Sequence, residues 1–444
     1  MGVFAKKDEE SFQEYRERVI NKLSQSFCGA KWYNATIWLG NGTTASCHHP
    51  PAHKIPLEEV AKSYKAIHNT TYKKAIRKQM MEGERPKECE YCWKIEDMGP
   101  DKVSDRVYKS VIYTDEELKK AKVELGYTED VDLKTLEIAF DPNCNFACSY
   151  CNASFSTTWQ NDIKKFGPYQ NLVSDGAGAF HHDGKHAMPY GRKNEGNPYV
   201  EAFWKWWPEL YKSMDTFRIT GGEPLLSKDT FKVLEYIQEN WEANPNLSLA
   251  INTNMNVPQK LMDRFIELCE DLSNNNKVRE LIIFTSAEGT NKQIEYTRFG
   301  MNYETFWKNV DTFLTKLPKI TVNVMATFNA LSVFSYGELI DKIFEMKKKH
   351  QNNQRYWVSA IQLDTSYLRW PSHLSVKILD DEHKELILES AKKALYYGIK
   401  EFTHDNYGFS NVEIQKIKRI YDYAVGDSMF STEKFRQDFI KFVD

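Results

Sequence analysis

The stretch Asp141-Pro-Asn-Cys-Asn-Phe-Ala-Cys-Ser-Tyr-Cys-Asn152 places three cysteines on one short loop, directly after the apolar residues 136–140. Cys144, Cys148 and Cys151 follow the spacing C-x3-C-x2-C. Three thiolates can hold three irons of a cubane cluster, because soft sulfur ligands select iron–sulfur chemistry. The fourth iron then has no protein ligand nearby in the sequence, and an open coordination position is typical of a catalytic metal site.

An aromatic residue, Tyr150, stands directly before the third cysteine. The spacing together with this aromatic residue resembles the signature of the radical S-adenosylmethionine (SAM) enzymes. The resemblance implies a [4Fe–4S] cluster on the three cysteines, bound with SAM, and places Tyr150 at the SAM site. Two structural alternatives are a zinc knuckle, although zinc sites usually close with a fourth ligand, and a ferredoxin-type carrier, whose runs use C-x2-C-x2-C.

The bulk composition indicates an ordinary globular protein of 444 residues, long enough for a large core and a second domain. The formal net charge of −3 gives no support for a nucleic-acid partner. No apolar run approaches the length of a membrane span, and residues 1–14 are charged, so we expect a cytoplasmic protein without a membrane partner. In a reducing compartment the eight cysteines are expected to be metal ligands rather than disulfides.

From about residue 136 onward, short β-type runs alternate with amphipathic helical runs, which predicts parallel strands joined by right-handed crossovers. Six β/α units are too few for a complete eight-fold barrel. The resemblance implies a partial (β/α)6 barrel of the TIM type, and the pattern agrees with it. The predicted strands are 136–141, 216–220, 247–252, 281–285, 320–327 and 357–363, and the predicted helices are 230–241, 259–272, 303–317 and 335–349.

These patterns predict four regions: an N-terminal helix over 1–27, a cysteine-rich module over 28–100, the barrel over 130–370 and a helical region over 371–444. Within the barrel region, residues 167–196 carry six of the 21 glycines. Long connections of this kind are either functional or surface excursions, and the sequence leaves both readings open.

The second predicted strand ends in Arg218-Ile-Thr-Gly-Gly-Glu-Pro-Leu-Leu226. Adjacent glycines at the carboxyl end of a strand let a ligand approach the backbone, at the end of a barrel where sites form. The segment resembles the Gly-Gly-Glu-Pro motif of radical SAM proteins, which binds the SAM amino group. The resemblance assigns that role to Gly221, Gly222 and Glu223, and a carboxylate suits an ammonium through a charge-assisted hydrogen bond.

Later strand ends resemble further SAM-binding patterns. The third strand ends Ala250-Ile-Asn-Thr-Asn254, similar to a Thr-Asn-Gly ending except that Met255 replaces the glycine. The fourth ends Thr285-Ser-Ala-Glu-Gly289 and is followed by Arg298, similar to the Ser-x-Asp-Gly…Arg pattern of the peptide-modifying branch, with Glu288 in place of Asp. The resemblance therefore implies that Asn254 contacts the SAM ribose and that Ser286 and Arg298 hold the SAM carboxylate. The fifth strand, Val322-Asn-Val-Met-Ala-Thr-Phe-Asn329, places Thr327 near the adenine by its position alone.

Four cysteines in the N-terminal region form a second set: Cys28, Cys47, Cys89 and Cys92. Cys28 and Cys47 follow the spacing C-x13-G-x4-C, with Gly42 as the glycine, and Cys89 and Cys92 follow C-x2-C. These two elements resemble the SPASM and twitch domains, although those modules normally follow the barrel. The resemblance implies an auxiliary [4Fe–4S] cluster. By ligand count a structural zinc ion fits equally well, and free thiols are a third alternative. The adjacent His48 and His49 are either alternative ligands or loop caps.

Two further features are predicted to serve packing. Cys269 lies on the apolar face of the predicted helix 259–272, where free cysteine behaves as a small hydrophobe. Phe203-Trp-Lys-Trp-Trp207 is similarly predicted to be a packed helix.

The sequence therefore predicts an enzyme that cleaves SAM reductively to a 5′-deoxyadenosyl radical, which abstracts hydrogen from a peptide or protein substrate. A flavodoxin or ferredoxin-type reductant is the expected electron donor. A small-molecule radical SAM dehydrogenase is the alternative enzyme. A non-catalytic iron–sulfur or zinc-binding interaction protein is the alternative from another class.

Overall fold

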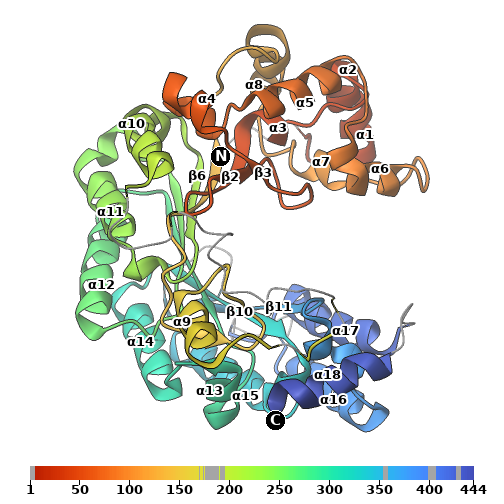
Figure 1. Ribbon diagram of the computed structural model, residues 1–444, viewed down its shortest axis with the longest axis vertical. Helices are drawn as coiled ribbons and strands as arrows, with labels where there is room; N and C mark the ends of the chain where they lie inside the picture. Colours follow the sequence, from red (N-terminus) through yellow and green to blue (C-terminus); the bar gives the residue numbers. More distant parts are fainter. Residues whose placement is uncertain are drawn as a thin grey trace. The chain divides into compact units, whose positions relative to one another are not determined.

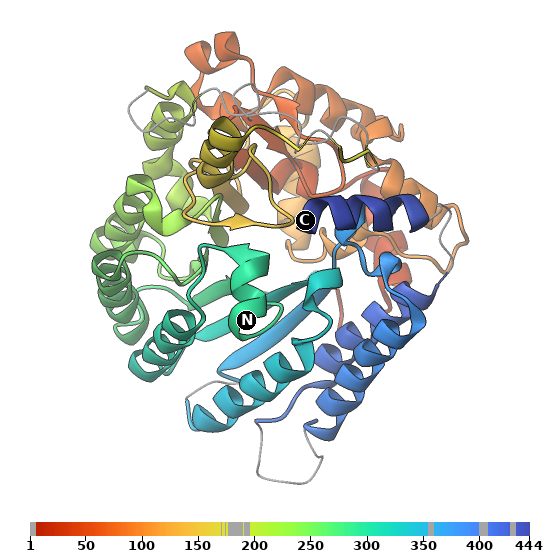
Figure 2. The same ribbon diagram turned by 60° about the horizontal axis from the view of Figure 1, so that its bottom comes forward.

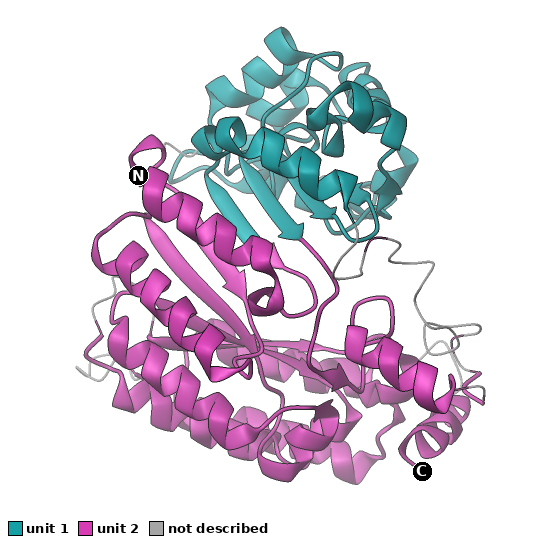
Figure 3. Cartoon of the chain, turned by 60° about the vertical axis from the view of Figure 1, so that its left-hand side comes forward, with its two compact units in different colours: residues 1–139, 192–218 teal, residues 140–191, 219–444 magenta. Residues whose placement is uncertain are grey.

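The computed structural model describes residues 6–169, 171–173, 175, 190, 196–353, 359–398, 407–426 and 432–444. The chain is mixed α/β with a large, mostly parallel sheet (Figure 1), which confirms that part of the fold prediction. It divides into two compact units, Met1–Ala139 with Arg192–Arg218 and Phe140–Gly191 with Ile219–Asp444 (Figure 3). The first unit thus extends beyond the expected module 28–100 and takes in a segment from within the expected barrel region.

A helical run from Phe12 to Leu23 opens the first unit. Ser11 caps it, because its hydroxyl accepts from the Glu14 backbone N–H while the Glu14 carboxylate accepts from the Ser11 backbone N–H. The predicted apolar face is present: Tyr15 is buried, and Phe12, Val19 and Leu23 pack against the same core. The run consists of α1 (Phe12–Tyr15), a π-helical turn η1 (Arg16–Ile20) and α2 (Asn21–Leu23).

Short strands in the first unit form a sheet that the sequence analysis did not anticipate. Strand β1 (Asn34–Trp38) pairs in parallel with β4 (Thr135–Ala139) and antiparallel with β2 (Thr43–Ala45), which pairs with β3 (His53–Lys54). Strand β6 (Thr216–Thr220) begins in this unit and ends in the second.

Helix α10 (Pro198–Ser213) belongs to the first unit and buries Phe203, Trp206 and Trp207, as predicted for a packed helix. The other described helices of this unit are α3 (Ala30–Tyr33), α4 (Leu57–Lys62), η2 (Tyr64–Ile67), α5 (Thr71–Met81), η3 (Lys87–Cys89), α6 (Glu90–Glu96), α7 (Asp105–Tyr108), α8 (Asp115–Lys120) and η4 (Ala121–Leu125).

Four parallel strands of the second unit lie in the order β7, β8, β10, β11. Helices connect successive strands, and Figure 2 shows them outside the strands. The strands are β7 (Ser248–Asn252), β8 (Glu280–Ser286), β10 (Thr321–Phe328) and β11 (Ile361–Tyr367), and the connecting helices are α12 (Gln259–Asn274), α14 (Tyr303–Lys316) and α15 (Tyr336–Lys349). The predicted order of elements is confirmed here. Strand β11 begins and ends four residues later than its predicted range 357–363.

The two faces of these strands differ in polarity. Val322, Val324 and Ala326 on β10 are buried on the face that the helices cover, together with Ile361 and Leu363 of β11. The opposite face is only half-buried on β10 and more open on β11, and it carries polar side chains: Asn323, Thr327, Gln362, Asp364 and Ser366. An antiparallel sheet often leaves one face exposed to solvent, whereas both faces of a parallel sheet are usually buried under other elements. The polar face is therefore an unusual feature of this unit.

The remaining described elements of the second unit are β5 (Ala147–Cys148), β9 (Arg298–Phe299), α9 (Thr157–Phe166), η6 (Pro224–Leu226), α11 (Lys228–Asn240), η7 (Trp241–Ala243), α13 (Asn291–Thr297), η8 (Ala330–Ser332), η9 (Ser372–Leu374), η10 (Val376–Ile378), α16 (Asp381–Tyr396), α17 (Asn411–Val425) and α18 (Thr432–Val443).

Candidate metal and cofactor sites

Hydrogen bonds from helix α9 hold the backbone of the three-cysteine loop. The Thr158 hydroxyl donates to the Cys144 carbonyl at 2.6 Å, and the Trp159 indole N–H donates to the Cys148 carbonyl at 2.9 Å. Strand β5, which contains Cys148, pairs antiparallel with β9. The loop conformation is therefore fixed both by the helix that follows it and by a strand about 150 residues later in the chain.

The three thiols of this loop influence one another. Cys148 is buried, and Cys144 and Cys151 are half-buried. Burial raises the pKa of the Cys144 and Cys151 thiols to about 12, and the Cys148 thiol adds to the rise in both. A bound cation reverses this effect, because metal ligation deprotonates thiols. The donor set fits a soft metal cluster.

A hydroxyl of the three-cysteine loop is unpaired within the described part of the chain. Among the described residues, the buried Ser149 hydroxyl and the Asn256 side-chain nitrogen are polar groups without a hydrogen-bond partner. Ser149 lies between Cys148 and Tyr150 in the loop. Buried atoms without a partner also occur away from this loop, for example the Tyr15, Tyr113 and Trp307 side chains, so these two do not by themselves indicate a ligand. Sequence reasoning missed both residues, because Ser and Asn in loops carry no specific signal.

Gly222 touches the loop that leads into the first cysteine. A Cβ at this position would lie 2.4 Å from the Asn143 carbonyl oxygen and 2.7 Å from the Pro142 carbonyl carbon and oxygen. The Glu223 backbone N–H donates to the same Asn143 carbonyl at 2.6 Å. Gly221 adopts φ +133°, which disfavours any residue with a side chain. The two glycines thus allow the end of β6 and the cysteine loop to meet backbone to backbone.

Glu223 is buried and joins two strand ends. Its carboxylate oxygens accept from the backbone N–H groups of Leu225 at 3.0 Å and Asn254 at 2.6 Å. Burial raises the pKa of Glu223 to about 7. The Asn254 amide donates to the Asn145 side chain, inside the cysteine loop, at 2.8 Å. An ionised carboxylate has about four acceptor sites, and the Thr253 side chain also interacts with this one, so the ammonium role expected for Glu223 stays a prediction.

Arg298 bonds to a carboxylate and to a cysteine. Its Nε donates to the two Glu288 oxygens at 2.9 and 3.1 Å, and the Tyr150 hydroxyl donates to them at 3.2 and 3.3 Å. An Arg298 terminal nitrogen donates to the Cys148 sulfur at 3.8 Å. The Arg298 guanidinium therefore bonds to Glu288 and Cys148 in this structure. The resemblance assigns the same guanidinium to the SAM carboxylate.

The two remaining expected SAM contacts lie at carboxyl ends of parallel strands. Ser286 ends β8, and Thr327 is the second-last residue of β10. Ser286 is in register with Met325, and Thr327 lies two residues further along β10 on the same half-buried face. Both therefore belong to the polar face of the second unit.

Four cysteines of the first unit line one small pocket: Cys28, Cys47, Cys89 and Cys92. Burial raises the pKa of the Cys28 thiol to about 12, and the other three thiols each add to the rise. Burial raises the pKa of the Cys92 thiol, and the Arg106 backbone opposes this rise. The structure therefore places the four cysteines that the sequence grouped around one pocket. Among the described residues no three cysteine sulfurs lie within 4.8 Å of one another, so the fit to a cluster or a zinc ion rests on the number and type of the ligands.

Nitrogen and oxygen donors lie at the edge of this pocket. His48, His49 and Asp105 place one ligand atom each within 4.8 Å of one another, the one such set of three among the described residues. The His49 Nε2 lies 2.6 Å from an Asp105 oxygen, and its ring stacks on Tyr91 at 3.8 Å. The His49–Asp105 hydrogen bond ties the Cys47 loop to α7, which accords with the loop-cap role, while the ligand role stays an alternative.

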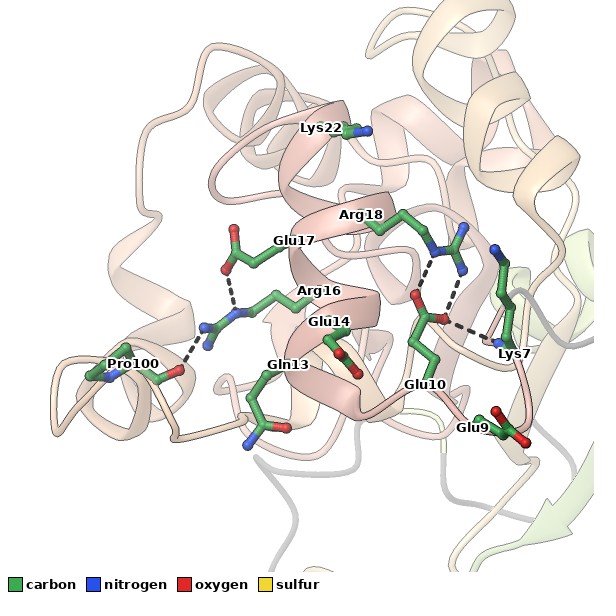
Figure 4. Close-up of a pocket in the computed structure, with 10 residues that line it drawn as sticks. All are labelled: Lys7, Glu9, Glu10, Gln13, Glu14, Arg16, Glu17, Arg18, Lys22 and Pro100. Atoms are coloured by element: carbon green, nitrogen blue, oxygen red, sulfur yellow. Dashed lines mark hydrogen bonds and ion pairs between the residues drawn. The ribbon is translucent and has the colours of Figure 1, made fainter.

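A larger hollow of the first unit lies along the N-terminal helix (Figure 4). Its charged groups pair with one another: the Arg18 guanidinium donates to Glu10 at 2.5 and 2.8 Å, and Arg16 donates to Glu17 at 3.0 Å. It is lined by Lys7, Glu9, Glu10, Gln13, Glu14, Arg16, Glu17, Arg18, Lys22 and Pro100. These mutual pairings stabilise the helix surface, and we assign no ligand to the hollow.

Two other sequence features have different outcomes. Cys269 is fully buried on α12, as predicted for a packing residue. Most of the glycine-rich segment 167–196 lies outside the described residues.

No protein-family model matches the chain, and no curated protein matches it in sequence. Among the described residues, no helix is both long enough and apolar enough to cross a membrane.

Proposed function

We propose that the chain is a radical SAM enzyme. The observation that carries the proposal is the contact between the three-cysteine loop and the Gly-Gly-Glu segment. Gly222 has no room for a side chain against residues 142–143, and Glu223 donates its backbone N–H to Asn143. The two motifs that the resemblance names separately are about seventy residues apart in sequence and lie against each other in the second unit. Because β4 and β6 are neighbours in the sheet, the segments that follow them meet, and Gly222 lets them meet backbone to backbone.

In this proposal Cys144, Cys148 and Cys151 hold three irons of a [4Fe–4S] cluster, and the fourth iron takes SAM. When bound, the cluster and SAM supply a one-electron cleavage that yields a hydrogen-abstracting adenosyl radical. Glu223 accepts a hydrogen bond from the SAM amino group, and α9 keeps the loop in place. Exclusion of water and orientation of the substrate are the contributions of the protein.

The proposal includes a partial (β/α)6 barrel around the site. It is supported in the second unit by four parallel strands with helical crossovers, whose carboxyl ends carry Asn254, Ser286 and Thr327 close to strand termini. The polar face with Asn323, Gln362 and Asp364 offers hydrogen-bonding groups to a substrate. Arg298 and Ser286 remain candidates for the SAM carboxylate, and Tyr150 for a neighbouring contact.

For the substrate we propose a peptide or protein side chain or backbone, because the serine–arginine pattern around Ser286 and Arg298 resembles that of the peptide-modifying branch. A small-molecule dehydrogenase is the second enzymatic candidate. Both need an external one-electron donor, and we propose a flavodoxin or ferredoxin. The four-cysteine pocket is proposed to hold an auxiliary [4Fe–4S] cluster.

The deciding experiment measures 5′-deoxyadenosine formed from SAM by anaerobically purified, reduced protein. We expect formation by the wild type and none by Cys148→Ala, because loss of one of three ligands removes the open iron site. Cys269→Ala is the matched control, since Cys269 is an equally buried thiol far from the loop in sequence, and it should keep the activity.

Continued cleavage by Cys148→Ala would exclude the assignment. A non-catalytic iron–sulfur or zinc-binding protein has no use for a SAM site, so absence of SAM binding by the iron-loaded wild type would favour that class instead.

A further inference from the structure

A lysine is buried against the four-cysteine pocket. The Lys31 side chain is 3% exposed and lines the same pocket as the four thiols. Burial raises the pKa of the Cys89 thiol to about 11, and the charge of the Lys31 ammonium opposes this rise. Lysines are almost never fully buried without a partner, because removing an ammonium from water is costly. The position of Lys31 therefore requires a compensating negative charge.

One partner of Lys31 is a carboxylate. Glu88 forms an ion pair with the Lys31 ammonium, and its other oxygen accepts from the Tyr72 hydroxyl at 2.7 Å. Tyr72 lies on α5 and is 45% exposed. The series Lys31–Glu88–Tyr72 thus leads from the pocket lining to the molecular surface of the first unit.

Other charged groups near the pocket have partners of their own. The Arg106 guanidinium donates to the Glu96 carboxylate at 2.7 and 2.9 Å. The buried Lys73 ammonium donates to the Thr44 hydroxyl and lies 3.1 Å from His68 Nδ1. Lys109 and Asp105 also line the pocket. Lys31 instead lines the pocket and forms its ion pair with Glu88, the residue next to Cys89 in the chain.

We propose that Lys31 is the charge-compensating residue of the group held by the four cysteines, and that Lys31 and Glu88 set its reduction potential in opposite directions. This inference rests on the auxiliary iron–sulfur cluster of the proposed function. The potential of such a cluster depends on its net charge environment and on hydrogen bonds to its sulfurs. A buried ammonium stabilises the more negative, reduced state, and a buried carboxylate destabilises it.

The test uses the full chain with Cys144, Cys148 and Cys151 replaced by Ala, so that only the first-unit cluster remains. The midpoint potential of this cluster is measured by electron paramagnetic resonance during an anaerobic redox titration. We expect Lys31→Met to shift the potential to more negative values and Glu88→Gln to shift it to more positive values. Lys31→Arg keeps the charge and should stay close to the parent, which controls for a packing defect in Lys31→Met.

Lys94 and Glu90 provide a matched control pair in the same unit. They form an ion pair on α6, which also carries Cys92, but both side chains are exposed, so Lys94→Met and Glu90→Gln should leave the potential unchanged. Potentials of Lys31→Met and Glu88→Gln that equal the parent value, or that move in the same direction, would overturn the proposal. A parent protein that holds zinc and no iron would overturn it as well. That result is distinguishable from failure of the proposed function, because SAM cleavage by the wild type tests the three-cysteine loop alone.

Discussion

Each cysteine site contacts a cation that is bonded to a carboxylate, and each carboxylate accepts from a tyrosine. In the second unit the series is Cys148–Arg298–Glu288–Tyr150, and Tyr150 belongs to the cysteine loop itself, so the series closes on its starting point. In the first unit Lys31 lines the pocket of the four cysteines, and the series Lys31–Glu88–Tyr72 ends on an exposed phenol.

The difference indicates separate tasks. In the proposed function, the closed series orients the loop that presents an open iron position to SAM, and it balances the charges around that loop. The series that leads outward connects the proposed auxiliary site with the surface. The number of cysteines agrees with this division, since three leave a coordination position open and four do not.

The largest expected effect separates the two sites by metal content. Wild type should hold about eight irons, two cubanes of four each. Replacing Cys144, Cys148 and Cys151 by Ala should leave about four, and replacing Cys28, Cys47, Cys89 and Cys92 should also leave about four. Iron and zinc analysis of anaerobic protein measures this. One zinc in place of the first-unit iron would make that site structural.

Gly222→Ala should remove the second-unit cluster while the first-unit cluster stays. The added methyl group would lie 2.4 Å from the Asn143 carbonyl oxygen, so the cysteine loop has to move. Overpacking of this kind costs about 1–3 kcal/mol. Iron content and thermal unfolding measure the two effects. Gly337→Ala is the control, because its Cβ meets nothing closer than 3.6 Å, and an equal loss of iron there would argue against a specific contact.

Glu223 should make stability depend on pH. Burial raises its pKa to about 7 from the ordinary 4.5, so the folded protein binds a proton that the unfolded chain releases between these values. The free energy of unfolding of the metal-free protein should therefore fall as pH rises from about 4.5 to 7, by up to roughly 3 kcal/mol, and stay level above that. Denaturant titrations across this range measure it. Glu223→Gln should flatten this part of the profile, and an unchanged slope would contradict the assignment.

The smallest expected effect concerns SAM affinity. A charge-assisted hydrogen bond contributes about 1.5–3 kcal/mol, so Glu223→Ala should weaken SAM binding about tenfold to a hundredfold with the cluster intact. Equilibrium titration of iron-loaded protein measures this, with the exposed Glu304→Ala as control. Equal affinities of the variant and the wild type would leave Glu223 as a purely structural link between Leu225 and Asn254.

Regular alternation made much of the second unit predictable. Strand β7 and helices α12, α14 and α15 lie within two residues of their predicted ends, because long amphipathic patterns are determined by local sequence. Strands β1 to β3 were missed. They have five, three and two residues, which is too short for a clear periodic pattern. Strand β1 also pairs with β4, about a hundred residues later in the chain, and no local pattern reveals such a pairing.

Side-chain partners were less predictable than the cysteine groups. Spacing alone grouped the four cysteines of the first unit, and the structure places them around one pocket. The bond between Arg298 and Glu288 depends on the pairing of β9 with β5, a tertiary feature. Lys31 carried no signal, because a lone lysine is expected to be exposed.

The division of the chain has a consequence for its synthesis. The first unit includes residues 192–218, and α10 within them buries Trp206 and Trp207, so this unit cannot complete its core until the ribosome has passed that segment. By then all three cysteines of the second-unit loop have also been made. Seven thiols are therefore present on the nascent chain before the core of the first unit is complete, and under the proposed function iron has to reach them before oxidation or other metal ions do.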